Sequence, residues 1–203
     1  AQASWHLANL DNVKVVKLLS RVIMDLAEGE IKQNLNRFDS GQTFSKYINK
    51  SYCKTASLIA NSTKAAGVLS NLEDKKLNSL YEFGKNIGLA FQVVDDILDF
   101  TGNDKQLGKP AVSDLASGYL TAPVLYALEE DKNLSVLINR ELVEKEDLNN
   151  ALNIVMNSQA IKRSRKLAED FAIASKEAIL FLPDSEYKRA LLALPEFVLS
   201  RLY

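Results

Sequence analysis

The stretch LNSLYEFGKNIGLAFQVVDDILDF, residues 77–100, decides the fold class. A helix built on it is apolar on most sides, so we expect it at the centre of the fold. Apolar residues recur at helical spacing in several further segments, at residues 12–35, 44–66, 120–129, 147–157, 160–180 and 184–202. No strand-length run alternates β-branched with polar residues. These patterns predict an all-α fold, with a single domain over residues 1–203.

One long segment breaks the helical pattern. Residues 102–117 hold Gly102, Gly108 and Pro110 between lysines and aspartates, which is typical of a loop. Pro123 is tolerated in the first turn of the helix that follows. Pro195 is expected to kink or interrupt the last helix.

The composition excludes several classes of protein. The 25 Lys and Arg residues balance 26 Asp and Glu residues, so a general electrostatic attraction to nucleic acid is not expected. The single Cys excludes an internal disulfide and a Cys-based zinc site, and the single His excludes a His-triad metal site within one copy of the chain. No apolar run reaches the roughly 18 residues that cross a bilayer, so we predict no transmembrane segment.

Three aspartates lie inside the central apolar segment, at Asp95, Asp96 and Asp99. They are costly to bury as free anions. On a helix, Asp95 and Asp99 share one face about 6 Å apart along the axis, and Asp96 lies about 100° round. Because like charges repel, this cluster favours a bound cation, and oxygen-only ligands suit Mg²⁺, which typically bridges to substrate phosphates. An exposed charged face at the end of an apolar run is the alternative.

Candidate phosphate ligands occur on both sides of this cluster. Lys54 and Thr55 stand in SYCKTASLIANS, residues 51–62, and Lys109 stands in LGKPAVSDL, residues 107–115. Gln92 precedes the aspartates by one helical turn. Lysine supplies a mobile positive charge for phosphate, and threonine adds a hydroxyl. Each lysine alone is more often a solvated surface group, so the prediction depends on their convergence with the carboxylates.

Together, residues 88–115 and 51–69 resemble the trans-type polyprenyl diphosphate synthases. DDILD, residues 95–99, looks like the second aspartate-rich motif of that family, and KT, residues 54–55, looks like its diphosphate-binding pair. FQ at residues 91–92 and GK at residues 108–109 also occupy the positions that the family pattern requires. The likeness extends over the whole chain and looks greatest for the solanesyl diphosphate synthase group of cyanobacteria and plastids.

The resemblance implies an antiparallel helix bundle of the isoprenoid synthase type and a set of residue roles. Asp95, Asp96 and Asp99 would hold Mg²⁺ against the diphosphate of an allylic substrate. The residues expected to contact that diphosphate, as substrate-binding and catalytic groups, are Lys54, Thr55, Gln92 and Lys109. The allylic C–O bond would ionise, the double bond of isopentenyl diphosphate would attack the cation, and a proton would pass to the departing pyrophosphate.

The resemblance also predicts a product five carbons longer at each round, and the overall likeness favours a long-chain polyprenyl diphosphate. Product length in such enzymes depends on bulk at the bottom of an apolar channel, largely from residues upstream of Ala1. A homodimer is expected, with a heteromer as the alternative. The expected location is a plastid or the cytoplasm of a cyanobacterium.

One departure from the family pattern concerns the first aspartate-rich motif, because no DDxxD occurs in residues 1–94. We interpret the chain as the C-terminal part of a synthase whose N-terminal helices are missing. By itself, this 203-residue chain is expected to show little or no condensation activity, whereas the complete protein is expected to be active.

Two alternatives remain open at this point. A non-catalytic helical subunit of a heteromeric prenyl synthase would fit the absent first motif, although the retained DDILD, KT and GK argue against it. A terpene cyclase with the same kind of fold would carry a second metal motif of Asn or Asp, Ser or Thr, and Glu. We find no such motif in the sequence.

Overall fold

The computed structural model describes residues 2–102 and 112–202 of the chain. These ranges contain helices and no strand, so the prediction of an all-α fold is confirmed. Lys109 and most of the loop predicted at residues 102–117 lie outside the described residues. The described elements are α1 (Gln2–Ala8), α2 (Val13–Leu35), α3 (Phe44–Ser51), the π-helix η1 (Tyr52–Ala56), α4 (Ser57–Leu69), α5 (Asp74–Thr101), α7 (Ser113–Ala116), α8 (Ala122–Glu130), α9 (Lys132–Asn139), α10 (Asp147–Asn157), α11 (Ala160–Ala178) and α12 (Glu186–Ser200).

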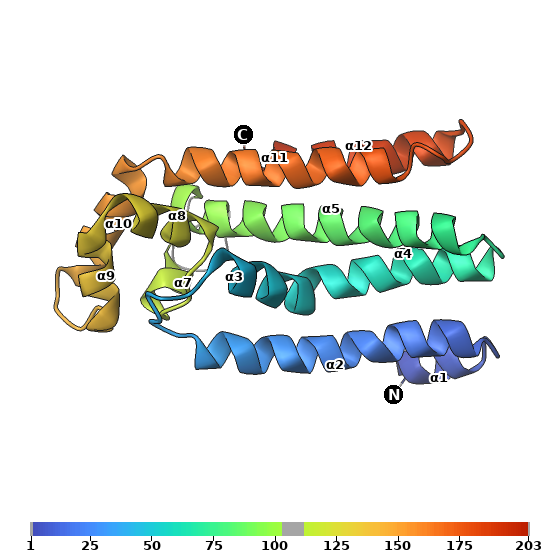
Figure 1. Cartoon of the computed structure of the whole chain (residues 1–203), viewed down its shortest axis with the longest axis horizontal. Coiled ribbons are helices and arrows are strands. Elements are labelled where there is room, and N and C mark those ends of the chain that lie inside the picture. Colours follow the sequence, from blue (N-terminus) through green and yellow to red (C-terminus); the bar gives the residue numbers. More distant parts are fainter. Residues whose placement is uncertain (1, 103–111, 203) are drawn as a thin grey trace.

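The long helices lie side by side along the longest axis of the molecule, with α5 between α4 and α11 (Figure 1). Helices α4 and α5 run antiparallel, and α12 packs on α5 and α11. The short helices α3 and α7 to α10 gather at the end of the bundle where α5 finishes. The aspartates of α5 therefore lie at this end, among the short helices. None of the described helices combines the length and apolarity needed to cross a membrane.

Several helix ends follow from the local sequence. The side chain of Asn12 accepts a hydrogen bond from the backbone N–H of Val15 at 3.2 Å, which caps the start of α2. Pro123 occupies the first turn of α8, as predicted. Pro195 lies inside α12, which continues to Ser200, so of the two predicted outcomes, a kink or an interruption, the interruption does not occur. Its ring is buried, and packing of α12 on the bundle offsets the missing N–H.

The helix predicted over residues 44–66 contains a turn that the periodicity did not indicate. Residues Tyr52–Ala56 form a π-helix between α3 and α4. Two glycines let neighbouring helices approach this turn closely. A Cβ on Gly88 of α5 would lie 2.5 Å from Cα of Ala56, and a Cβ on Gly29 of α2 would lie 3.1 Å from Cβ of Cys53. Lys54 and Thr55 lie on this π turn. Because π turns in helices are frequently found at functional sites, their position is consistent with a functional role.

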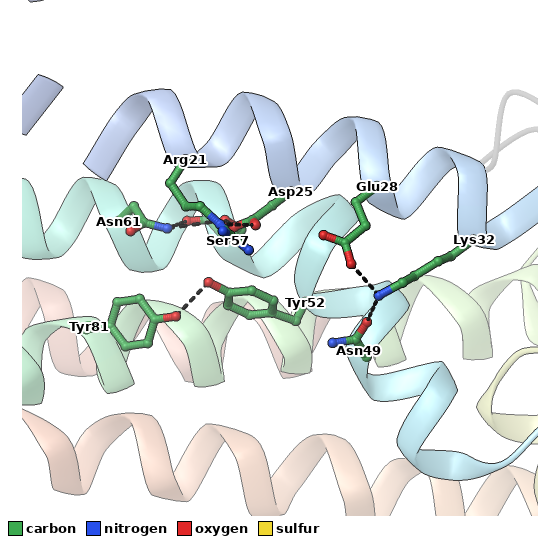
Figure 2. Close-up of polar contacts among 9 residues, drawn as sticks. All are labelled: Arg21, Asp25, Glu28, Lys32, Asn49, Tyr52, Ser57, Asn61 and Tyr81. Atoms are coloured by element: carbon green, nitrogen blue, oxygen red, sulfur yellow. Dashed lines mark hydrogen bonds and ion pairs between the residues drawn. The ribbon is translucent and has the colours of Figure 1, made fainter. Parts of the chain in front are cut away.

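Polar contacts tie α2 to the neighbouring helices (Figure 2). The buried carboxylate of Asp25 accepts hydrogen bonds from Nε of Arg21 at 2.7 Å and from Oγ of Ser57 on α4 at 2.5 Å. Further along α2, Lys32 donates to Asn49 of α3 at 2.7 Å. By contrast, the apolar side chain of Ile23 is exposed. Within the described residues, the hydrogen bonds from Ser57 and to Asn49 join α2 to α4 and α3, while Ile23 of α2 stays exposed.

Candidate functional site

A chain of hydrogen bonds links three helices at the end of the bundle that holds the aspartates. Oγ1 of Thr55 on η1 donates to Oε1 of Gln92 on α5 at 2.6 Å. The amide nitrogen of Gln92 donates in turn to Oδ1 of Asp96 at 2.9 Å. The hydroxyl of Tyr47 on α3 donates to the other oxygen, Oδ2, at 2.7 Å. Both oxygens of Asp96 are therefore oriented by neutral donors from two helices.

Burial dominates the electrostatics of Asp96, which is 2% exposed. Loss of solvation raises the pKa of its carboxyl from 3.8 to about 6, although Lys50 and the donors Tyr47 and Gln92 favour the ionised form. The pKa of Tyr47 is raised for the same first reason, burial, and then by the nearby charge of Asp96. The site thus holds a carboxyl whose ionisation is costly in the absence of a further positive charge.

Lys54 extends from the π turn toward α2. Its ammonium donates to Oε1 of Gln33 at 2.8 Å and lies 3.3 Å from a carboxylate oxygen of Glu30. Both contacts are exposed, so their contribution to stability is small. They keep the lysine at the edge of the same pocket that Gln92 and Asp96 line.

The pocket between these helices is lined by polar side chains. Its lining includes Gln33, Lys50, Lys54, Gln92, Asp96 and Thr121. Thr121 is 2% exposed, and its hydroxyl makes no hydrogen bond within the described part of the chain. A buried hydroxyl without a partner indicates a position where a ligand or water supplies the missing contact.

The two other predicted aspartates have separate partners. Asp95 forms an ion pair with Arg201 near the C-terminus, with 2.7 Å between Nη2 and Oδ1, and the same guanidinium lies 4.7 Å from the centre of the Phe91 ring. Asp99 is buried and accepts hydrogen bonds from the hydroxyl of Ser113 and the backbone N–H of Asp114, both at 3.2 Å. Asp99 therefore orders the start of α7 in this structure.

The sequence predicted a metal site at Asp95, Asp96 and Asp99, and their arrangement bears on which ion fits. Over residues 2–102 and 112–202, no group of three acidic, His or Cys side chains is close enough to hold one ion. The donors are all carboxylate oxygens, which suit a hard cation such as Mg²⁺. Such an ion usually takes one or two carboxylates and completes its shell with water and phosphate. The donor set fits that mode of binding and does not form an all-protein cage.

The structure therefore brings Thr55, Gln92 and Asp96 into direct contact and places Lys54 at the rim of their pocket. It directs Asp95 and Asp99 elsewhere. Lys109 lies outside the described residues.

Several residues of the pocket region were missed by the sequence reasoning, among them Gln33, Tyr47, Lys50 and Thr121. Lys50 and Tyr47 precede Lys54 by four and seven residues, which is the spacing of one helical face. That spacing is the signal that could have found them. Gln33 belongs to another helix, and only the tertiary contact with Lys54 identifies it.

Comparison of the chain with known proteins identifies its family. The polyprenyl synthetase family profile matches residues 1–155. A prenyl transferase of Synechocystis is 54% identical over 203 residues, which is all of this chain and 63% of that protein. The chain belongs to the polyprenyl synthetase family.

Other relatives of this polyprenyl synthetase chain agree. Chloroplastic solanesyl diphosphate synthase 2 of Arabidopsis thaliana is 49% identical over 202 residues, covering all of this chain and 48% of that protein. The apo form of an Arabidopsis medium/long-chain prenyl pyrophosphate synthase superposes with a TM-score of 0.90 at 36% identity, covering 100% of this chain and 70% of that one. A Caulobacter crescentus polyprenyl synthase, crystallised with calcium and isoprenyl diphosphate, superposes with a TM-score of 0.88 at 30% identity. The match covers 97% of this chain and 61% of that one.

The chain spans about half to two thirds of the length of these curated relatives, at 63% of the Synechocystis protein and 48% of the Arabidopsis one.

Proposed function

We propose that the protein at its full natural length is a trans-type prenyltransferase that condenses an allylic diphosphate with isopentenyl diphosphate to a long-chain polyprenyl diphosphate. The single observation that carries the proposal is the link from Thr55 through Gln92 to Asp96 beside Lys54. It places an amide, a carboxylate and an ammonium group around one pocket, with the Thr55 hydroxyl bonded to the amide behind it, and these groups suit a metal-bound diphosphate. The named relatives support the same reaction class.

In this proposal, Lys54, Thr55, Gln92 and Lys109 bind the diphosphate of the allylic substrate. Carboxylates among Asp95, Asp96 and Asp99 would hold Mg²⁺, which would supply charge stabilisation to the leaving pyrophosphate. The C–O bond breaks with its electron pair on the pyrophosphate. The new C–C bond then forms with isopentenyl diphosphate, and the departing pyrophosphate takes the proton. The chain's own donors act by positioning and by electrostatic stabilisation.

The ion pair between Asp95 and Arg201 bears on this role. A cation that binds Asp95 competes with the Arg201 guanidinium for the same carboxylate. We propose that this contact is exchanged when metal and diphosphate arrive. Chloroplastic and cyanobacterial relatives support a plastid or a cyanobacterial cytoplasm as the location, and we propose a homodimer as the assembly.

A steady-state condensation assay tests the proposal. The protein at full natural length is supplied with Mg²⁺, labelled isopentenyl diphosphate and an allylic diphosphate, and chain-elongated product is measured. We expect product from the wild type and a loss of at least a hundredfold in kcat/KM for Asp96→Asn. Absence of elongation in the wild type, with the substrates intact, would refute the proposal. Restoration of activity by an added partner protein would instead favour the non-catalytic subunit.

A further inference from the structure

Lys50 is a pocket residue that the predicted motifs do not include. Lys50 lies on α3, one helical turn before Lys54, and lines the pocket with Gln92 and Asp96. Its ammonium lies 5.3 Å from the centre of the Tyr47 ring. The hydroxyl at the far end of that ring donates to Asp96. Lys50 is therefore held against the same tyrosine that orients the buried carboxylate.

Lys50 differs from Lys54 in its contacts. Lys54 touches Gln33 and Glu30, whereas the Lys50 ammonium makes no hydrogen bond and no ion pair with any residue that the structure describes. Burial lowers the pKa of Lys50, and the charge of Asp96 opposes that shift. A lysine withdrawn from water without a hydrogen-bond acceptor is unfavourable, and proteins seldom retain one without a reason.

A second group in the same pocket also lacks a partner. The buried hydroxyl of Thr121, at the start of α8, makes no hydrogen bond within the described ranges. An ammonium and a hydroxyl that both line one pocket, and are both unsatisfied, are complementary to an anion with several oxygens.

The charges narrow the class of anion. Lys50 and Lys54 lie four residues apart, and like charges at this spacing repel each other. One monophosphate between the two ammonium groups offsets only part of this repulsion. A diphosphate carries more negative charge on two linked groups and can meet both ammoniums, whose long flexible side chains adjust to it.

We infer that Lys50 is a further diphosphate-binding residue, which contacts the diphosphate together with Lys54 and favours diphosphate over monophosphate. The inference rests on the proposed function, because it places one more cation in the same pocket. Lys50 then supplies the positive charge that Asp96 and the incoming anion both face.

The test measures binding of inorganic pyrophosphate and of orthophosphate by titration calorimetry, with Mg²⁺ present, in the protein at full natural length. Lys50→Met removes the charge and keeps the length of the side chain. We expect its pyrophosphate affinity to fall about tenfold or more, the size of one lost charge-assisted hydrogen bond. Orthophosphate affinity should fall less, and Lys50→Arg should recover part of the pyrophosphate affinity.

Lys46→Met is the matched control. Lys46 lies one turn earlier on α3, is exposed, and faces Asp39 at 3.8 Å outside the pocket. Its pyrophosphate affinity should stay within twofold of the wild type. Urea unfolding separates binding from folding, since Lys50→Met replaces an unsatisfied ammonium and should unfold at the same or a higher urea concentration. Should that variant not fold, Lys50→Gln serves in its place.

The outcomes distinguish this inference from the proposed function. Unchanged pyrophosphate affinity in Lys50→Met, with a clear loss in Lys54→Met, would overturn the role of Lys50 and leave the proposed function standing. Failure of the wild type to bind pyrophosphate at all would overturn both. Loss of stability without loss of pyrophosphate affinity would assign Lys50 a structural role and would also overturn the inference.

Discussion

Gln92 donates a hydrogen bond at 2.9 Å to Asp96, one turn further along α5, while its carbonyl oxygen accepts from Thr55 on the neighbouring π turn. The amide therefore joins the KT motif to the DDILD motif. Thr55 and Gln92 are 37 positions apart in the sequence. An amide is suited to this position because it both donates and accepts. The relative position of the two motifs is consequently sensitive to this one side chain.

We predict that Gln92→Ala lowers kcat/KM by about 10- to 100-fold, because the half-buried hydroxyl of Thr55 and the buried carboxylate of Asp96 each lose a partner, at a cost of about 1–3 kcal/mol. The measurement is steady-state condensation kinetics on the full-length protein. Asn86→Ala is a suitable control, since Asn86 is on the same helix and, among the described residues, its side chain donates only to the carbonyl of Glu82 in the preceding turn. Equal activity of Gln92→Ala and the wild type would show that the amide does not join the motifs functionally.

A pH dependence of stability follows from Asp96. Its pKa is about 6 in the folded protein, compared with 3.8 for an unperturbed carboxyl. The folded state therefore binds the proton more tightly. The stabilising contribution of the neutral carboxyl is fully present below about pH 4 and is lost as pH rises through about 6. The difference is on the order of 3 kcal/mol.

Urea unfolding between pH 4 and 7, in the absence of metal and diphosphate, measures this effect. The free energy of unfolding of the wild type should decrease over this range relative to Asp96→Asn, which cannot ionise at this position. Parallel profiles for the two proteins would mean that burial does not raise the pKa of Asp96.

Gly88 provides a test of the close contact between α5 and the π turn. A Cβ at this position would lie 2.5 Å from Cα of Ala56, so the helices must separate in Gly88→Ala. We predict a loss of about 1–3 kcal/mol in stability by calorimetric or urea unfolding. Gly41→Ala is the control, because its added Cβ would meet only a carboxylate oxygen of Asp39, at 3.2 Å. A variant of Gly88 as stable as the wild type would contradict the packing described here.

The same substitution should also lower condensation activity, because Ala56 adjoins Thr55 and a shift of the π turn lengthens the contact between Thr55 and Gln92. If Gly88→Ala lost stability but kept the wild-type kcat/KM at low temperature, the packing of Gly88 would not affect the site, and this prediction would be wrong.

Many helix ends of this fold can be predicted from residues that are close together in the sequence. The cap at Asn12, the proline in the first turn of α8 and the bounds of α10 follow from residues within one or two turns of each other. The periodicity missed α9, a short helix of eight residues, and the π turn at Tyr52–Ala56. Gly29 and Gly88, which come from two other helices, allow close packing against the π turn, and a sequence window around residues 52–56 does not include them.

Some contacts of the site could be predicted from the sequence, and others could not. The motifs selected Thr55, Gln92 and Asp96, which the structure joins by hydrogen bonds. Helical spacing alone placed Asp95 and Asp99 together, yet Asp95 pairs with Arg201, more than a hundred residues later in the chain. Such a contact is set by how α12 packs on α5, and sequence periodicity carries no information about it.

The most direct test of the central claim is a crystal structure of the full-length protein with Mg²⁺ and an allylic thiolodiphosphate, which resists ionisation. We predict that the diphosphate lies within hydrogen-bond distance of Lys54 and Gln92, with Mg²⁺ between its oxygens and the aspartates of α5. A diphosphate bound elsewhere in the bundle, with Thr55, Gln92 and Asp96 unchanged and far from it, would contradict the account.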